Sequence, residues 1–240
     1  MESKKGSTED RSSPRQNRTD LLQPDFTPHA PVQRLGEDLV HGPALQDHIV
    51  VILGVGPGLG INIANVFAAR GYTTAILSRS KQRLEAWAEE LHATALAFRK
   101  ANHISAGPPD QKLSAAFACD GLDNDSIIRA VQQICEHWPD KKIGTACYNF
   151  SIRKRGPFLQ QRFDQVKEGV QGSILAGFTF AQAMLNKMEA HGEGGNLLVT
   201  GATSSTRGRE GFAGFAASSK LSFLPGHRRR PAARPGLRAR

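Results

Sequence analysis

Residue types that support specialised scaffolds are scarce in this chain of 240 residues. Its three cysteines are too few for a disulfide framework and lack the close pairing of zinc ligands. No apolar run approaches the roughly 18 to 20 residues of a membrane helix, since the best candidate, 49–61, contains five glycines and prolines. The N-terminal segment is polar and has no secretory signal pattern. We therefore expect a protein of the reducing cytoplasmic interior that does not span a membrane.

Acidic residues are missing from one end of the chain, which decides how its net charge of +9 is interpreted. Residues 1–46 carry 6 basic and 7 acidic side chains, and residues 47–226 carry 19 and 15. The last fourteen residues carry six arginines and no acid. Most of the excess charge is therefore terminal, and the main body is only mildly basic. The terminal arginines alone would favour a nucleic-acid binder, which we keep as a minor alternative.

Two terminal segments lack the pattern of a folded domain. Residues 1–46 contain five prolines and many polar side chains, and we expect them to be a disordered extension. Residues 221–240 show no apolar periodicity, and we expect an irregular basic tail. The predicted folded domain therefore covers residues 47–220.

Within that domain, apolar runs alternate with amphipathic segments of helical period. The continuous β-branched run at 49–53 predicts a strand buried on both faces of a parallel sheet. We predict strands at 49–53, 72–77, 115–119, 143–149 and 196–200. We predict helices at 59–70 and 81–91, a helix capped by Asp123 with Ile127, Ile128, Val131 and Ile134 on one stripe, a helix at 163–188, and a polar loop at 98–112. The alternation indicates an α/β fold with a Rossmann-like, doubly wound parallel sheet that is incomplete at its C-terminal end.

A glycine-rich segment joins the first predicted strand to the first predicted helix. It reads Gly54-Val-Gly-Pro-Gly58-Leu-Gly60. Glycines at such a junction allow a tight turn and a close approach to a pyrophosphate at the helix N-terminus. A purely structural turn is the alternative, but the complete strand–turn–helix–strand context favours dinucleotide binding.

The Gly-x-x-x-Gly-x-Gly spacing resembles that of the short-chain dehydrogenase/reductase family. Asp120 follows the third strand, where that family places an aspartate against adenine, and Asn149 is the one residue kept from its Asn-Asn-Ala-Gly motif. The resemblance covers about residues 47 to 220 and implies a dinucleotide-binding fold. The cofactor-binding residues that it implies are Gly54, Gly58, Leu59, Gly60, Asp120 and Asn149.

The end of the second strand indicates which nicotinamide cofactor is preferred. NAD-binding proteins usually carry an acidic residue there, roughly 20 residues beyond the glycines, but no Asp or Glu lies between Gly60 and Glu85. The strand ends instead in Ser78-Arg79-Ser80-Lys81. Because a guanidinium can bind a 2′-phosphate with two hydrogen bonds, Arg79 favours NADP(H) over NAD(H).

The catalytic residues of the family are not matched. Its chemistry uses a Tyr, a Lys four residues later and a Ser thirteen residues earlier, whereas the two tyrosines here, Tyr72 and Tyr148, are both assigned to strands. Alignment places Phe215 at the Tyr position and Ala202 at the Ser position. Gly169 stands at the position of a helical Asn, and Ser219 stands at the Lys position, with Lys220 one residue late. Lys220 and Ser204 are the remaining candidates for catalytic roles.

The resemblance therefore implies an NADP(H)-binding oxidoreductase acting on a small carbonyl or alcohol substrate with an atypical active site. A non-catalytic dinucleotide-binding module is the main alternative. No metal is expected, because no histidine is paired with a carboxylate at ligand spacing. Family members usually form homo-oligomers through a helix pair, which an incomplete C-terminal end would weaken.

Overall fold

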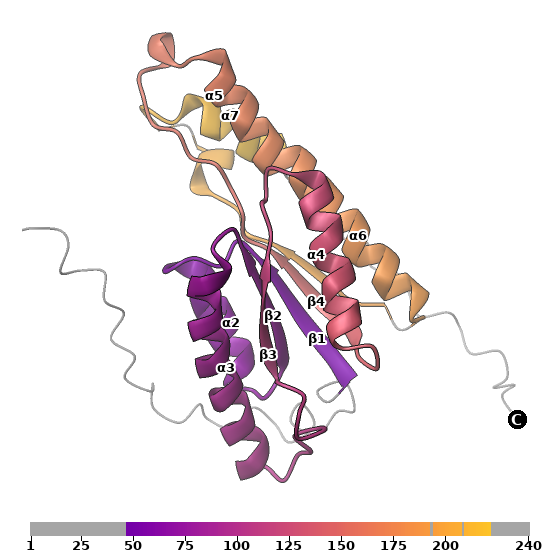
Figure 1. Ribbon diagram of the computed structural model, residues 1–240. Helices are drawn as coiled ribbons and strands as arrows, with labels where there is room; N and C mark the ends of the chain where they lie inside the picture. The colour runs from indigo at the N-terminus through magenta and orange to yellow at the C-terminus, as the bar shows by residue number, and fades with distance from the viewer. Residues whose placement is uncertain (1–46, 193, 208, 222–240) are drawn as a thin grey trace, which may run out of the picture. The chain divides into compact units, whose positions relative to one another are not determined.

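A five-stranded parallel sheet forms the centre of the protein. The computed structural model describes residues 47–192, 194–207 and 209–221, so the predicted extension 1–46 and residues 222–240 of the predicted tail lie outside the described residues. Leu221, the first residue of that predicted tail, is helical. The strand order is β3-β2-β1-β4-β5 (Figure 1). The strands are β1 (His48–Leu53), β2 (Thr73–Ser78), β3 (Ser114–Ala118), β4 (Lys142–Tyr148) and β5 (Asn196–Val199). This order is that of the dinucleotide-binding fold and confirms the predicted class.

Helices cover both faces of the sheet. They are α2 (Leu59–Ala68), α3 (Lys81–Ala101), α4 (Asn124–His137), α5 (Phe163–Val170), α6 (Ala176–Ala190) and α7 (Ala213–Leu221), with a π-helical segment η4 (Gln171–Leu175) and short 3-10 turns η3 (Phe158–Gln160) and η5 (Thr203–Ser205). In the described ranges, no helix has the length and hydropathy required to cross a bilayer.

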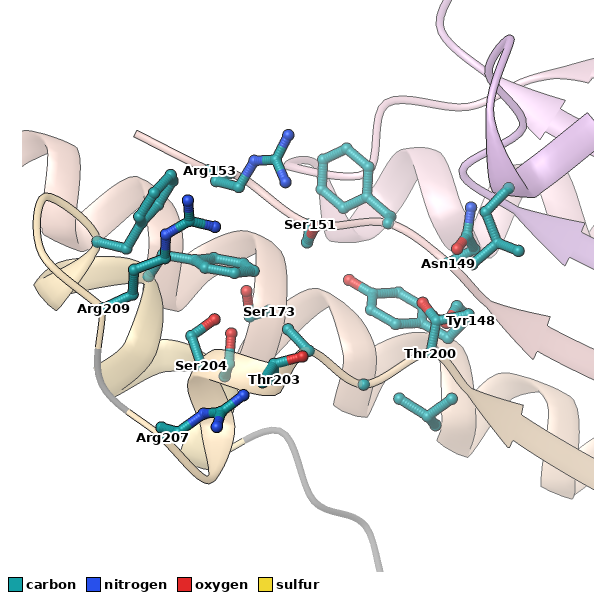
Figure 2. Close-up of a pocket in the computed structure, with 18 residues that line it drawn as sticks. Tyr148, Asn149, Ser151, Arg153, Ser173, Thr200, Thr203, Ser204, Arg207 and Arg209 are labelled. Atoms are coloured by element: carbon teal, nitrogen blue, oxygen red, sulfur yellow. The ribbon is translucent and has the colours of Figure 1, made fainter. Parts of the chain in front are cut away.

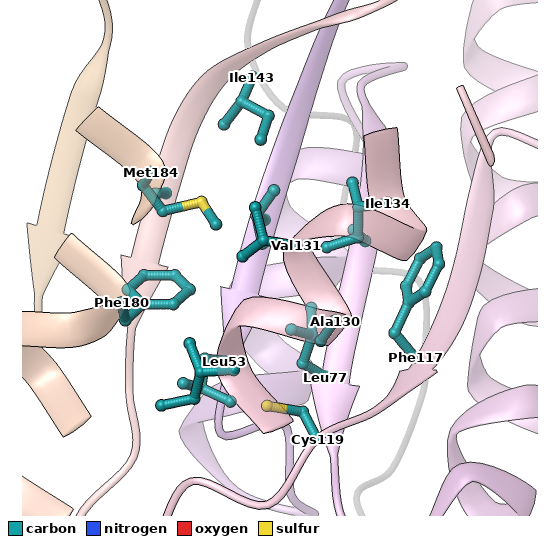
Figure 3. Packing of buried hydrophobic residues seen from close by; sticks show 14 of the residues in the cluster. Leu53, Leu77, Phe117, Cys119, Ala130, Val131, Ile134, Ile143, Phe180 and Met184 are labelled. Atoms are coloured by element: carbon teal, nitrogen blue, oxygen red, sulfur yellow. The ribbon is translucent and has the colours of Figure 1, made fainter. Parts of the chain in front are cut away.

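The core is divided into two layers by the alternation of side chains along β1. Val50 and Ile52 pack with α2 and α3, whereas Ile49, Val51 and Leu53 pack with α4 and α6. Both sets are fully buried, which explains why β1 is apolar without alternation. Figure 3 shows the second layer, with Leu53, Leu77, Ala130, Val131, Ile134, Phe180 and Met184.

Several local predictions were wrong. Helix α3 runs ten residues past Leu91, to Ala101, so residues 98–101 are helical and not part of a polar loop. The reason is that Leu91, Ala95 and Arg99 continue one buried stripe at a spacing of four residues. On α4, Ile128 is 44% exposed and Ala130 occupies the buried stripe instead.

Two further differences concern the ends and continuity of elements. Tyr72 precedes β2 and does not lie within it. The predicted helix over 163–188 is present but contains the π-helical segment η4. Asp123 caps α4 as predicted, since its carboxylate accepts a hydrogen bond from the backbone N–H of Asp125 at 2.9 Å.

A buried arginine ties the C-terminal end of α3 to its surroundings. The Arg99 side chain is 1% exposed, and its Nε donates to the carbonyl of Gly71 at 2.7 Å. Nη1 donates to the carbonyl of Ser105 at 3.0 Å, and Nη2 donates to the Thr73 hydroxyl at 3.4 Å. One side chain therefore connects α3 to the turn before β2 and to the loop that follows the helix.

Replacing Arg99 with alanine should lower the free energy of unfolding by about 3 kcal/mol, because it leaves a cavity and removes the donors to two carbonyls. Urea unfolding followed by circular dichroism measures the change. Arg83 on the same helix is exposed, so Arg83→Ala should change the free energy by less than about 0.5 kcal/mol. Equal effects of the two substitutions would contradict a structural role for Arg99.

Candidate functional site

The glycine turn between β1 and α2 is packed against the end of β4. Gly54 has φ 94°, and a Cβ there would lie 2.7 Å from the carbonyl carbon of Asn149. A Cβ on Gly60 would lie 2.5 Å from the carbonyl oxygen of Gly54. The Asn149 side-chain amide donates to that same oxygen at 2.9 Å. Gly54 and Gly60 therefore permit close packing, and Asn149 holds the turn in place.

The outer side of the same turn is open. A Cβ added at Gly56 or Gly58 would meet no atom within 4 Å. Helix α2 begins directly after Gly58 and has no acidic residue in its first turn. Free backbone N–H groups and the helix dipole favour an anion at this position. The turn therefore fits the pyrophosphate of a dinucleotide.

The other predicted cofactor residues follow neighbouring strands at the same edge of the sheet. Arg79 comes directly after β2 and is exposed. Asp120 lies two residues after β3, and its Oδ1 accepts a hydrogen bond from the backbone N–H of Leu122 at 3.0 Å. The carboxylate thus stabilises the turn before α4, a role independent of any ligand. Because β1, β2 and β3 are adjacent and parallel, their carboxyl ends bring these residues to the edge that carries the glycine turn.

Beside the turn lies a cavity of about 680 Å³, formed by the segments after β4 and β5 together with η4 and α7. Leu59 and Asn149 line it, which connects the cavity to the glycine turn (Figure 2). The other lining residues are Tyr148, Phe150, Ser151, Arg153, Ser173, Val199, Thr200, Gly201, Ala202, Thr203, Ser204, Arg207, Arg209, Phe212, Phe215 and Ser219. This volume suits a small-molecule site.

Tyr148 contributes a phenol to this cavity from the end of β4. Its hydroxyl donates to the carbonyl of Gly172 in the π-helical segment, and the side chain is 4% exposed. Burial raises the pKa of Tyr148. The phenol is therefore neutral, with its proton engaged by a carbonyl, and is unsuited to act as a base. The exclusion of Tyr148 from the catalytic tyrosine role agrees with this geometry.

Ser173 is a polar cavity residue that the sequence analysis missed. It is 6% exposed, and its Oγ is the one buried side-chain oxygen or nitrogen among the described residues without a hydrogen-bond partner. It lies in η4, and π-helical turns of this kind occur frequently at functional sites. The available signal was its position directly after Gly172 in the segment aligned with the family.

Comparison with models of protein families shows which family the chain belongs to. The family model described as short chain dehydrogenase matches residues 48–221. The chain belongs to this family. Among curated proteins, none matches the chain.

Solved structures of other short-chain dehydrogenases share the fold. One from Rhodopseudomonas palustris is 24% identical, with a TM-score of 0.58 and coverage of 73% of both chains. A short chain dehydrogenase from Shigella flexneri complexed with NADP is 20% identical (TM-score 0.60, covering 73% of this chain and 67% of that one). An alcohol dehydrogenase from the archaeon Thermococcus sibiricus complexed with 5-hydroxy-NADP is 20% identical (TM-score 0.60, covering 73% and 66%).

Three of the four positions aligned with the catalytic residues of short-chain dehydrogenases meet in the cavity. Phe215 and Ser219 line it from α7, and Ala202 and Ser204 line it from the segment after β5. Lys220 also lies in α7, but its side chain is outside the described set. The structure therefore brings Phe215, Ser219, Ala202 and Ser204 together in one cavity.

The aligned helical position, Gly169, lies in α5 next to Ser218. A Cβ on Gly169 would make an ordinary contact, 3.5 Å from the Ser218 Oγ. Ser218 is buried, and its hydroxyl donates to the carbonyl of Phe215 at 3.1 Å. The space beside Gly169 thus contains a hydroxyl that is used within α7.

The described cavity wall offers hydroxyls and guanidinium groups but no carboxylate, imidazole or amine. None of the three cysteines is among the residues that line the cavity. Burial raises the pKa of Cys119 to about 12, that of Cys147 to about 11 and that of Cys135 above its usual value. No cluster of potential metal ligands occurs in the part of the chain that the structure describes. Among the described lining residues, hydroxyl groups are therefore the candidates for proton transfer.

Proposed function

We propose that the chain is an NADP(H)-binding short-chain dehydrogenase that interconverts a small carbonyl compound and its alcohol, with a slow chemical step. The observation that carries the proposal is the cavity shared by the aligned catalytic positions and by Leu59 and Asn149 of the cofactor-binding half. NADPH, when bound, supplies the hydride. The protein supplies the binding surface, the orientation of the substrate and the electrostatics around its oxygen.

Each candidate residue has a defined proposed role. Gly54, Gly58 and Gly60 form the pyrophosphate turn, and Asn149 anchors it. Ser204, half-buried in η5 and lining the cavity, would donate a hydrogen bond to the substrate oxygen. Lys220 would contact the nicotinamide ribose. Phe215 contributes no proton, so this position only excludes water.

The proposed role of Asp120 is to contact the adenine ring. This role is compatible with its hydrogen bond to Leu122, because only Oδ1 is used there. Leu59 would lie between the adenine half of the cofactor and the cavity, since it is 59% exposed at the start of α2 and lines the cavity.

The preference for NADP(H) rests on Arg79. It is exposed after β2 and makes no ion pair with a described acid, whereas Lys81 is 3.8 Å from Glu85. The guanidinium is therefore available to a 2′-phosphate. Two structures with this fold, those from Shigella flexneri and Thermococcus sibiricus, contain NADP or an NADP derivative, which supports the same choice.

NADPH should bind more tightly than NADH, and Arg79→Ala should remove about 1 to 3 kcal/mol of that difference, as expected for a lost charge-assisted contact. Fluorescence titration of both cofactors into the full chain measures it. Arg83→Ala, which changes an exposed arginine on α3, serves as the control and should leave the ratio unchanged. Equal affinities of the unmodified chain for the two cofactors would show that Arg79 has no such role.

A non-catalytic dinucleotide-binding module remains the second candidate, favoured by Phe215 and Ala202 at the catalytic positions. The two functions are separated by following NADPH oxidation with a panel of aldehydes and ketones. Cofactor binding without any turnover supports the module, and turnover above the rate without protein supports the oxidoreductase. The terminal arginines that favoured nucleic-acid binding lie outside the described residues.

We also propose that the chain associates with itself through α6. Leu175 directly before this helix is 48% exposed, and Phe178 and Leu185 within it are 57% and 39% exposed. Apolar side chains grouped on one element are typical of an interface. Light scattering of the full chain should give a mass above that of a monomer, and Phe178→Glu should lower that mass.

A further inference from the structure

Three arginines line the cavity. Arg153 follows β4, and Arg207 and Arg209 follow η5. None of them forms an ion pair with a described acid, and no Asp or Glu is among the described lining residues. Figure 2 shows their side chains toward one end of the cavity, with Asn149 toward the other.

This separation argues against a role in binding the cofactor phosphates. The pyrophosphate turn adjoins Asn149, and Arg79 lies after β2, outside the cavity lining. The cavity arginines belong instead to the segments after β4 and β5. They are therefore placed to contact the substrate.

The guanidinium of Arg209 also has a contact that restricts its position. Its central carbon lies 5.8 Å from the centre of the Phe212 ring, and Phe212 itself lines the cavity. Three positive charges around one cavity repel each other, and an anion bound between them would be attracted to all three. A guanidinium binds a carboxylate or phosphate through two parallel hydrogen bonds.

The Ser173 hydroxyl is an independent indication of a polar ligand. It is more than nine-tenths buried, it lines the cavity, and no described residue satisfies it. A buried hydroxyl without a partner is destabilising because it has lost its hydrogen bonds to water, and a ligand oxygen would remove that cost. Ser204 adds a second hydroxyl on the same wall.

We infer that the substrate is a small carbonyl compound or alcohol that carries an oxyanionic group. This inference rests on the proposed function. Arg153, Arg207 and Arg209 bind the oxyanion, which is a carboxylate or a phosphate. The Ser173 hydroxyl hydrogen-bonds a polar atom of the same molecule. The cavity of about 680 Å³ accommodates such a molecule beside the nicotinamide.

The test measures binding, so that it does not depend on turnover. The full chain saturated with NADP⁺ is titrated by calorimetry with 4-carboxybenzaldehyde, with 4-formylphenyl phosphate and with the neutral methyl 4-formylbenzoate. We expect at least one of the two anions to bind about tenfold or more tightly than the ester, and that advantage to fall as salt is raised. The stronger of the two anions identifies the oxyanion as carboxylate or phosphate.

The Arg207→Gln/Arg209→Gln double variant should reduce anion binding about 10- to 100-fold, the range of a lost charge-assisted contact, and leave the ester unaffected. Arg83→Gln is the matched control and should change the binding of neither the anions nor the ester. Ser173→Ala should weaken the anions and the ester to a similar degree without lowering the melting temperature, because it removes only an unsatisfied hydroxyl.

Equal binding of the anions and the ester, or a double variant that weakens NADPH binding instead, would overturn the proposal. The proposal would also be overturned if the Ser173→Ala variant bound all three probes as tightly as the unmodified chain. Absence of NADPH oxidation together with anion-selective binding would reject the proposed oxidoreductase function but retain the anion site. The two failures are thus distinguishable.

Discussion

The Phe215→Tyr/Ser219→Lys double variant should carry out NADPH-dependent carbonyl reduction about 10² to 10⁴-fold faster than the unmodified chain, the usual contribution of general acid catalysis. The side chains now at these positions, Phe215 and Ser219, both line the cavity from α7. A phenol alone has a pKa of about 10, and a nearby ammonium group would lower it. Phe215→Tyr alone should therefore give a smaller increase than the double variant. Stopped-flow measurement of NADPH oxidation gives the chemical rate.

The control for this prediction is Phe212→Tyr, which adds the same hydroxyl elsewhere on the cavity wall. It should leave the rate unchanged. The prediction also requires the unmodified chain to be far slower than the typical enzyme turnover of about 10 s⁻¹. A rate near that value would show that another group already supplies the proton and that position 215 is not the catalytic one.

Gly54→Ala and Gly58→Ala should separate the structural part of the glycine turn from its binding part. Gly54→Ala should lower the free energy of unfolding by at least about 2 kcal/mol, because it combines a positive φ with a Cβ 2.7 Å from the backbone of Asn149. A Cβ added at Gly58 would meet no protein atom within 4 Å. Gly58→Ala should therefore change stability by less than about 1 kcal/mol and weaken NADPH binding about tenfold or more.

Denaturant unfolding and fluorescence titration of both variants give the two quantities. We expect Gly54→Ala to lower mainly the free energy of unfolding and Gly58→Ala to lower mainly the affinity for NADPH. Unchanged NADPH binding by Gly58→Ala would mean that the pyrophosphate does not approach this turn. Unchanged stability of Gly54→Ala would mean that the turn can move away from β4.

Much of the fold could be predicted because its signals are local. Each of the five strands is an apolar run whose period differs from that of the neighbouring helices. Burial on both faces explains the runs of β1 and β2, whereas the edge strand β5 is apolar but mostly exposed. The Asp123 cap is encoded by residues two positions apart. Boundaries were less predictable: the stripe that extends α3 ends in Arg99, and the sequence alone does not show that a charged residue is buried. Its partners come from two separate segments, Gly71 and Thr73 at the start of β2 and Ser105 in the loop after the helix.

The site divides in the same way. The glycine turn could be identified from sequence because one continuous segment contains the strand end, the glycines and the helix start. The cavity could not, because it is assembled from segments after β4 and β5, from η4 and from α7. From the sequence, Tyr148 was predicted only as a strand residue. Neither Ser173 nor the three arginines were predicted as residues of the site. No spacing in the sequence relates them to one another.

By itself, the sequence determined the α/β class and the order of strands and helices along the chain, and it predicted a dinucleotide-binding turn and the alignment of Phe215 and Ala202 with the family's Tyr and Ser. Only the tertiary structure decided that Ser173 is buried without a partner and that Arg153, Arg207 and Arg209 line the same cavity as Phe215. The physical reason is the separation along the sequence over which each kind of interaction acts. Periodicity and turn chemistry act within a few residues, whereas the cavity depends on parallel strands that bring distant segments to one edge of the sheet.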